Sequence, residues 1–169
     1  MGLATTVGTA FPVQIVSGGQ TGADRAALDW AIAHGIEHGG WCPRGRRAED
    51  GTIPAQYRLR ETPRSTYIQR TEWNVRDSDG TVIFSMKERL VAGPLRTLEF
   101  AIRRRKPHLH LAAEAARDAT VQLKDWMREC GIRVLNVAGS RASKEPQVGE
   151  FVRRALEQVL KVQGPNPGH

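Results

Sequence analysis

The residues best suited to chemistry lie in one short stretch, Ser17-Gly18-Gly19-Gln20-Thr21-Gly22-Ala23-Asp24-Arg25, directly after an apolar run. Its glycines allow the main chain to turn sharply and a ligand to approach the backbone. If a helix follows, the free N–H groups of its first turn and the positive end of its dipole favour a phosphate or another oxyanion. A turn that only reverses the chain needs one capping side chain, whereas this turn has four polar candidates: Gln20, Thr21, Asp24 and Arg25. We therefore predict an anion-binding corner. A purely structural glycine turn is the alternative, because the pattern is neither G-x-G-x-x-G nor a Walker loop.

A strand and a helix must hold this stretch in place. Apolar residues predict a strand over Val13–Val16 and a helix over Asp24–Ala33 that ends at His34-Gly35. The helix face that we expect to be buried consists of Ala27, Leu28, Ala31 and Ile32. Two other polar corners follow predicted strands, at Ser85–Thr97 and at Gly139–Ser143. Because ligands bind beyond the carboxyl ends of parallel strands, we expect the three corners to converge on one crevice.

The rest of the chain repeats this pattern of short apolar strands and amphipathic helices. Strands that alternate with helices indicate a mostly parallel sheet with helices on both faces. We predict a single α/β, Rossmann-like domain over residues 13–162, with a flexible leader at 1–12 and a disordered tail at 163–169. Further strands are expected at His38–Cys42, Thr81–Phe84, His108–Leu111 and Ile132–Val137, and further helices over Ser65–Arg76, from Gly93, and over Arg117–Cys130 and Pro146–Val162.

The composition indicates a soluble protein with an anionic partner. The chain has 169 residues, of which 40% are apolar and 25% charged, as in an ordinary single domain. Its 25 Lys and Arg residues exceed its 18 Asp and Glu residues, so the net charge is +7. This excess fits an anionic ligand or nucleic acid. The densest basic cluster, Arg103-Arg104-Arg105-Lys106, ends a predicted helix and lacks an aromatic platform, so a small anionic ligand is favoured over nucleic acid.

The sequence predicts neither a membrane protein nor a metalloprotein. No apolar run approaches the roughly 20 residues that span a bilayer, and the first dozen residues do not resemble a secretory signal, so we expect a cytoplasmic location. Cys42 and Cys130 are far apart and belong to no C-x-x-C pair. We expect two small buried thiols rather than a disulfide or a zinc site. The five histidines show no metal-ligand spacing.

One long segment, Arg44–Pro63, has glycines, prolines and charges but little apolar periodicity. Such stretches in compact domains are often functional loops or lids. A solvated surface loop is the alternative. Within the segment, Glu49 and Asp50 follow closely after Arg46-Arg47.

Three motifs together resemble one family. They are Gly18-Gly19-Gln20-Thr21-Gly22-Ala23-Asp24, Trp41-Cys42-Pro43-Arg44-Gly45-Arg46-Arg47-Ala48-Glu49-Asp50-Gly51 and Trp73-Asn74-Val75-Arg76-Asp77-Ser78-Asp79-Gly80, and the similarity covers about Val13 to Leu160. The chain resembles the molybdenum carrier family, a circularly permuted YpsA-like group of Rossmann-like proteins related to the Lonely-guy and lysine-decarboxylase-like proteins. The resemblance implies a homo-oligomer that holds molybdenum cofactor (molybdopterin), a phosphorylated pterin whose dithiolene binds an oxo-metal. Other members are described as binding nucleotide-derived ligands.

The corners and the resemblance together imply a ligand site without catalytic or metal-binding residues. By resemblance, the first motif forms a ligand loop and Asn136, Gly139 and Arg141 lie on the last corner. Arg25 and Arg141 could bind phosphate, and Trp73 could stack on a flat ring or pack in the core. The predicted ligand-binding residues are Gly18, Gly19, Gln20, Thr21, Gly22, Asp24, Arg25, Glu49, Asp50, Trp73, Asn74, Ser85, Gly93, Arg96, Thr97, Asn136, Gly139 and Arg141.

The chain departs from the family at one corner. Where members have Gly-Gly-Thr-x-x-Thr, this sequence has Ala92-Gly93-Pro94-Leu95-Arg96-Thr97. Pro94 removes both a hydroxyl and an N–H group from the expected anion site. We hypothesise that the charge of Arg96 compensates for this loss.

The predicted function is the binding and carriage of molybdenum cofactor, or of a similar phosphorylated pterin or nucleotide-type anion, without chemistry of its own. A molybdoenzyme acceptor is the implied partner. A nucleotide sensor is one alternative. A nucleoside monophosphate phosphoribohydrolase, the activity of Lonely-guy relatives, is disfavoured because Phe100 stands where their Pro-Gly-Gly-x-Gly-Thr-x-x-Glu motif has its glutamate. Glu99 is one position early, about 100° away on a helix.

Overall fold

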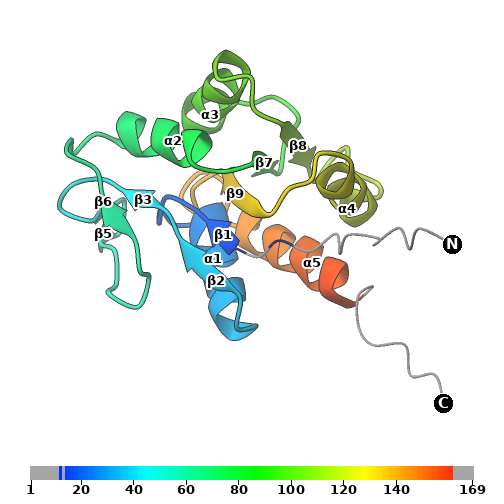
Figure 1. Cartoon of the computed structure of the whole chain (residues 1–169), viewed down its shortest axis with the longest axis horizontal. Coiled ribbons are helices and arrows are strands. Elements are labelled where there is room, and N and C mark those ends of the chain that lie inside the picture. Colours follow the sequence, from blue (N-terminus) through cyan, green and yellow to red (C-terminus); the bar gives the residue numbers. More distant parts are fainter. Residues whose placement is uncertain (1–11, 13, 162–169) are drawn as a thin grey trace, which may run out of the picture.

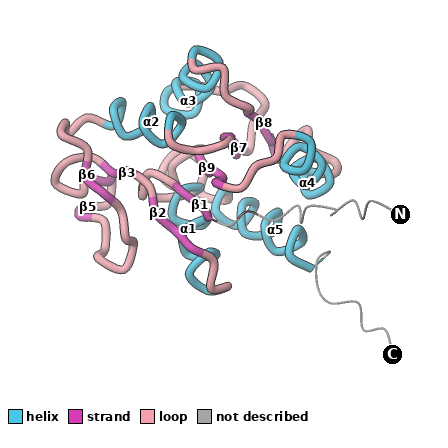
Figure 2. The backbone as a smooth tube through the Cα atoms, in the orientation of Figure 1, coloured by secondary structure: helices cyan, strands magenta, loops and turns pink. Residues whose placement is uncertain are grey.

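A five-stranded parallel sheet forms the centre of the molecule. The computed structural model describes residue 12 and residues 14–161, so most of the predicted leader, Val13 and the predicted tail lie outside the described residues. The strand order is β2-β1-β9-β7-β8, and every neighbouring pair is parallel (Figures 1 and 2). The strands are β1 (Gln14–Val16), β2 (Glu37–Gly39), β7 (Gly80–Ser85), β8 (His108–Ala112) and β9 (Val134–Gly139).

The direction of the chain across the sheet reverses near its middle. From β1 the chain moves outward to β2, whereas from β7 it moves to the opposite edge at β8, and β9 then returns between β1 and β7. Val16 of β1 lies opposite Asn136 of β9, and Ile83 of β7 lies opposite Ala138. A crevice at the carboxyl ends of β1, β9 and β7 is the expected consequence of this reversal.

Helices cover both faces of the sheet, as the alternation of strands and helices predicts. On one face, α1 packs on α5 and α5 on α4, while α2 and α3 pack together on the other face (Figure 1). Within the described residues, no helix is long and apolar enough to cross a membrane. The helices are α1 (Ala23–Ala33), α2 (Tyr67–Arg76), α3 (Ala92–Arg103), α4 (Ala119–Glu129) and α5 (Val148–Lys161).

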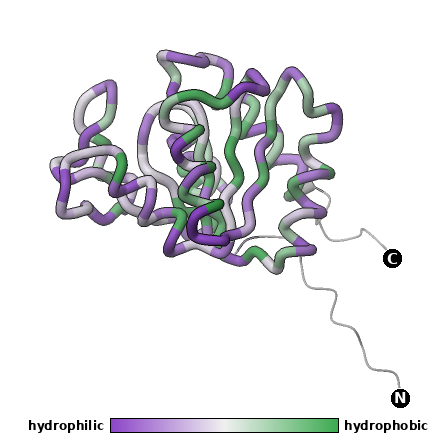
Figure 3. Tube along the Cα trace, turned by 90° about the horizontal axis from the view of Figure 1, so that it is seen from above, coloured by the Kyte–Doolittle hydropathy of each residue, from purple (hydrophilic) through white to green (hydrophobic). Residues whose placement is uncertain are grey.

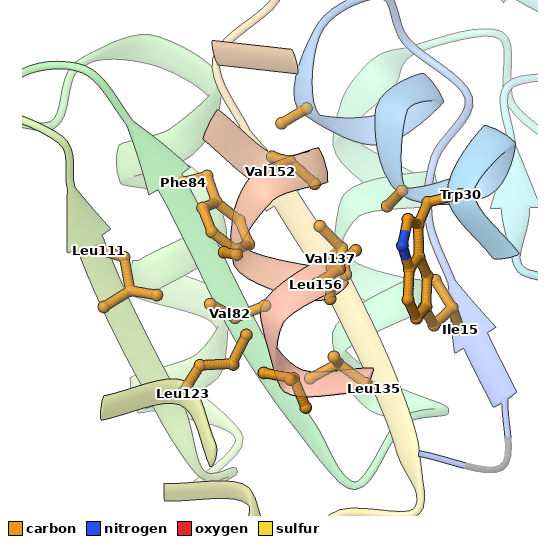
Figure 4. Packing of buried hydrophobic residues seen from close by; sticks show 14 of the residues in the cluster. Ile15, Trp30, Val82, Phe84, Leu111, Leu123, Leu135, Val137, Val152 and Leu156 are labelled. Atoms are coloured by element: carbon orange, nitrogen blue, oxygen red, sulfur yellow. The ribbon is translucent and has the colours of Figure 1, made fainter. Parts of the chain in front are cut away.

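The main core lies between the sheet and the α1, α4 and α5 face. Phe84 of β7 lies among side chains from β9 and α5 (Figure 4). Its ring meets that of Phe151 edge-on, with 5.3 Å between the ring centroids. Every residue of β7 is buried, which confirms the predicted buried strand at Thr81–Phe84. Hydrophobic stretches run through the central strands in Figure 3.

Two expectations about the core are wrong. Ile32 is 43% exposed, because the buried side of α1 instead includes Trp30 beside Ala27 and Ala31. Cys130 is exposed, because α4 ends at Glu129 and the chain turns away after its buried residues Leu123 and Met127. Cys42 is buried, as predicted.

The segment between β2 and α2 forms a folded extension, here called the arm (residues 43–64). It contains β4 (Arg47–Ala48), which pairs with β5 (Gly51–Thr52) in an antiparallel hairpin, and β6 (Arg60–Glu61), which pairs with β3 (Trp41–Cys42) just before the arm. A second small core joins the arm to α1: Ile53, Tyr57 and Leu59 of the arm pack with Leu28 of α1 and Cys42 of β3. The arm is largely irregular, but its apolar side chains are packed on α1, so it is not a bare surface loop.

Candidate ligand-binding site

A cavity of about 680 Å³ lies beyond the carboxyl ends of β1, β7 and β9. Small-molecule sites typically have volumes of this order. Its lining includes residues of the first corner (18–24), the second corner (85–97) and the third corner (139–143). The predicted convergence of the three corners is confirmed.

The cavity brings together just over half of the predicted site residues. Those that line it are Gly18, Gln20, Asp24, Asn74, Ser85, Gly93, Thr97, Asn136, Gly139 and Arg141. The others lie outside its lining: Gly19, Thr21, Gly22, Arg25, Glu49, Asp50, Trp73 and Arg96. Trp73 packs edge-on against Trp41, with 4.7 Å between ring centroids, and Arg76 covers its ring.

Several N–H groups of the first corner already have protein acceptors. The Gln20 N–H donates to Asp24 Oδ2 at 3.1 Å, and the Ala23 N–H donates to the Ser140 carbonyl at 3.1 Å. The Arg25 N–H donates to the Gln20 carbonyl, also at 3.1 Å. The prediction of free N–H groups at the start of α1 is therefore wrong for Ala23 and Arg25, because protein acceptors already occupy them.

A buried ion pair lies beneath the first corner. Arg70 of α2 places Nη1 3.4 Å from Asp24 Oδ2 and 3.0 Å from the Gly18 carbonyl oxygen. Burial raises the pKa of the Asp24 carboxyl, and the charge of Arg70 opposes that rise. Burial also lowers the pKa of Arg70. Both side chains line the cavity, but each neutralises the other.

The arm is tied to the first and third corners by two carboxylates. Glu49 accepts hydrogen bonds from the Thr21 hydroxyl, from Ser143 N at 3.2 Å and from Ser143 Oγ at 2.5 Å. Desolvation raises the pKa of Glu49, but the bonds from Ser143 and Thr21 outweigh it and the net shift is downward. Asp50 pairs with Arg25, which lowers the pKa of that carboxyl. Glu49 and Asp50 therefore hold the arm against the first and third corners in this structure.

The second corner is open. Helix α3 begins at Ala92 without a side-chain cap, and among the described residues no acceptor binds the N–H groups of Ala92 and Gly93. A Cβ added at Gly93 would have no neighbour within 4 Å, so this glycine faces free space in the cavity. Pro94 has no N–H group to offer. The free main-chain donors that were predicted at α1 are thus found at α3.

Cationic side chains surround this opening. Lys87, Arg89, Arg141 and Lys144 line the cavity. Three of these, all but Arg141, were missed from the sequence, although they lie within two to four residues of predicted site residues. The carboxylates of the lining are engaged: Asp24 with Arg70, and Glu145 with the Ser140 hydroxyl and with Met86 N at 3.0 Å.

A serine and a histidine meet at the base of the second corner. Ser85 Oγ lies 2.7 Å from His110 Nε2 and donates to the Lys87 carbonyl at 2.6 Å. Burial lowers the pKa of His110. Because the hydroxyl proton is directed to the Lys87 carbonyl, the ring most simply donates Nε2–H to Ser85, and the pair holds the turn in place. In the described part of the chain, no carboxylate is hydrogen-bonded to the other ring nitrogen.

The structure places no carboxylate where the phosphoribohydrolase motif has one. Phe100 is buried against Val75 and Ala101, and Glu99 is exposed. Neither residue lines the cavity. Across the described residues, no group of three or more His, Cys, Asp and Glu side chains could hold a metal ion.

A doubly covered parallel sheet with a cationic cavity at its reversal point defines a Rossmann-like α/β protein with a candidate ligand site. The chain belongs to the circularly permutated YpsA SLOG family, whose model matches residues 15–160. It is similar to the crystal structure of a protein from Syntrophus aciditrophicus SB named "Putative molybdenum carrier protein", with 47% identity and a TM-score of 0.85. That similarity covers 88% of this chain and 95% of the other. No curated protein matches the sequence. The family resemblance and the fold class predicted from the sequence are confirmed.

Proposed function

We propose that this protein binds and carries molybdenum cofactor, or a similar phosphorylated pterin or nucleotide-type anion, in the cavity between the three corners. The observation that carries the proposal is the open second corner. Two unpaired main-chain N–H groups at the start of α3 lie in a cavity that four cationic side chains line in addition to Arg70, which is paired with Asp24. A helix N-terminus with such neighbours favours a phosphate.

The proposal assigns roles to the residues of the cavity. The N–H groups of Ala92 and Gly93 bind the phosphate, and Lys87 and Arg89 add charge-assisted hydrogen bonds. The remainder of the ligand occupies the space toward Gln20. The metal, as cargo, is held by the ligand rather than by protein side chains. The family resemblance and the name of the similar structure support this choice among phosphorylated ligands.

A nucleotide sensor is a second candidate, because the arm is coupled to the cavity. Arg141 lines the cavity and its Nη1 lies 3.8 Å from Glu49 Oε2, so a ligand that draws Arg141 inward would weaken one tie of the arm. A carrier does not need this coupling. A partner that binds only the ligand-loaded protein, and only while Glu49 is intact, would favour the sensor.

Identification of the co-purifying ligand tests the proposal. The full chain, purified gently, should contain molybdenum and a pterin by metal analysis and mass spectrometry. The Lys87→Ala/Arg89→Ala variant should lose both. The matched control Arg153→Ala/Arg154→Ala removes two exposed cations of α5 that pair with Glu150, and it should retain them. A molybdenum-free nucleotide would favour the sensor, and release of free base from a nucleoside monophosphate would favour the hydrolase.

A homo-oligomer, a molybdoenzyme acceptor and a cytoplasmic location accompany this proposal. Native mass spectrometry of the loaded protein measures the first. Transfer of molybdenum to an apo-molybdoenzyme, followed by its recovered activity, tests the second.

A further inference from the structure

A row of apolar side chains lies exposed along α3. It begins at the N-cap residue Val91, which is 58% exposed, and continues through Leu95 at 38% to Ile102 at 58%. Leu98 lies between the last two and is only partly buried. Residues spaced three and four positions apart share one side of a helix. These four residues therefore form a continuous apolar row, here called the α3 stripe.

The stripe is separate from the side of α3 that holds the helix in the fold. The buried residues of α3 are Thr97, Phe100 and Ala101, and the last two pack with Val75 of α2. Apolar surface is more stable out of water, and a row at this spacing is the pattern by which one helix packs on another. The stripe is therefore a candidate interface.

The spacing of the stripe fits a second copy of the same helix. From Val91 to Ile102 the gaps between its members are four, three and four residues, which is the same sequence in either direction. Two copies of α3 that run antiparallel therefore match each other about a two-fold axis. In that pairing Val91 meets Ile102, and Leu95 meets Leu98.

The charges beside the stripe are complementary in the same pairing. Arg96 and Glu99 are exposed, and neither forms an ion pair among the described residues. A helix turns by about 100° per residue, which places both on one flank of the stripe. Equivalent flanks meet in an antiparallel pair, so Arg96 of each subunit lies near Glu99 of the other. A second copy of this chain thus satisfies both the spacing and the charges of this face.

We infer that two antiparallel copies of the α3 stripe form the interface of a homodimer, and that the partner subunit completes the rim of each cavity. Val91 belongs both to the stripe and to the lining of the cavity. Because Ile102 of the partner subunit lies against Val91, the partner's Arg103 reaches the rim beside Lys87 and Arg89. Like charges repel, so an anion held between them should stabilise the dimer. This second part rests on the proposed function, because it requires an anionic ligand in the cavity.

Sedimentation velocity of the full chain tests the interface. Leu95→Glu places a charge at the centre of the stripe and should weaken dimerisation by about a hundredfold or more. The control Val121→Glu changes an apolar residue of α4 that is 55% exposed, and it should leave the dimer intact. Arg96→Glu makes like charges face each other and should weaken the dimer by about tenfold. Arg96→Glu/Glu99→Arg exchanges the two charges and should restore it.

The same measurement with 5′-AMP, a nucleotide that carries one phosphate, tests the rim of the cavity. The nucleotide should strengthen the wild-type dimer by about tenfold, because binding and dimerisation are linked. Arg103→Gln should remove this response. The control Arg128→Gln, at an exposed position of α4, should retain it.

The outcomes separate this inference from the function on which its second part rests. A wild type that stays monomeric with and without 5′-AMP, or a dimer that Leu95→Glu weakens no more than Val121→Glu does, overturns the interface. If Leu95→Glu does not fold, an unchanged dimer in Arg96→Glu overturns it instead. A dimer that ignores 5′-AMP, although calorimetry shows that the nucleotide binds, overturns only the role of Arg103. If calorimetry detects no binding of 5′-AMP or inorganic phosphate, the proposed function fails, whereas a dimer that depends on Leu95 still supports the α3 interface.

Discussion

The first and second corners both join a parallel strand to a helix at the same edge of the sheet, but they differ in how their N–H groups are used. In the first corner, Asp24, Gln20 and Ser140 accept from the main chain. In the second corner, the N–H groups of Ala92 and Gly93 have no acceptor within the described residues. A glycine-rich sequence therefore does not by itself define an anion site. What matters is whether protein acceptors already occupy the donors.

The difference has a physical cause in the side chains that surround each corner. The first corner is rich in polar groups, and these bind one another, α2 and the arm, so that it becomes a structural joint. The second corner approaches α3 through Leu90 and Val91, which have no side-chain acceptors. Its donors are left to the cavity. Substitutions in each corner test this contrast.

Removing Arg70, the partner of the buried Asp24 carboxylate, should destabilise the first corner. Arg70→Met leaves the Asp24 carboxylate buried and unpaired, and we expect it to lower the free energy of unfolding by about 3–5 kcal/mol. Urea denaturation measures the loss. The double variant Asp24→Asn/Arg70→Met removes both charges and should recover most of it. If Arg70→Met alone changes stability by less than about 1 kcal/mol, the pair is not what holds this corner.

Glycine-to-alanine substitutions at the two corners should have opposite effects. Gly22 has φ 82° and ψ −125°, and an added Cβ would overlap the Ser140 carbonyl oxygen. The conformation alone should cost Gly22→Ala about 1–3 kcal/mol, and the overlap adds to this. Gly93→Ala meets no atom within 4 Å and should leave stability unchanged or raise it by up to about 1 kcal/mol.

The same pair separates folding from binding. Gly93→Ala places a methyl group beside the free N–H groups, so it should weaken the binding of 5′-AMP in calorimetry. The thermal unfolding midpoint should not fall below that of wild type. Equal losses of stability in Gly22→Ala and Gly93→Ala would show that the two corners are packed alike, contrary to the structure.

Local patterns were sufficient to predict the corners but not their bonding. The apolar run at Thr81–Phe84 and the glycines that follow the strands mark where the chain turns, and such signals are local. The partner of Asp24 is Arg70, which lies 46 positions away, and no local pattern specifies that pairing. The polar residues that follow the glycines bind to the arm and to α2, and two of them, Gln20 and Asp24, also line the cavity. The cavity cations Lys87, Arg89 and Lys144 were missed because single charges in loops are usually just solvated.

The second corner should also be sensitive to pH through His110. Burial lowers the pKa of this side chain below its ordinary value of 6.5, although Glu145 and Glu88 oppose the shift. The unfolded chain then binds more protons than the folded chain just below pH 6.5, so stability is present above that pH and falls as the pH decreases through the folded pKa. His110→Gln should flatten this pH dependence in denaturation curves measured across the window of histidine titration, about pH 5 to 8.

The exposed residue His108, on the same strand, provides the control. His108→Gln should leave the pH profile as in wild type. Burial also lowers the pKa of His38, so His38 should account for any pH dependence of stability that persists in His110→Gln. If wild type and His110→Gln show the same pH profile of stability, titration of His110 does not affect the stability of this corner.

The smallest expected effect concerns Ala92, at the entrance to α3. This alanine has φ 49°, a left-handed conformation that glycine adopts freely and that costs alanine about 1–2 kcal/mol. Glycine loses about 0.5–1 kcal/mol through the greater freedom of its unfolded chain. Ala92→Gly, which restores the residue of the family pattern, should therefore raise stability by up to about 1 kcal/mol. Ala101→Gly, in the regular and buried part of the same helix, should instead lower it by about 1 kcal/mol or more. If both variants lose stability equally, Ala92 is not strained. If only Ala92→Gly gains, the open corner retains a conformation that suits its two free N–H groups at a cost to the fold.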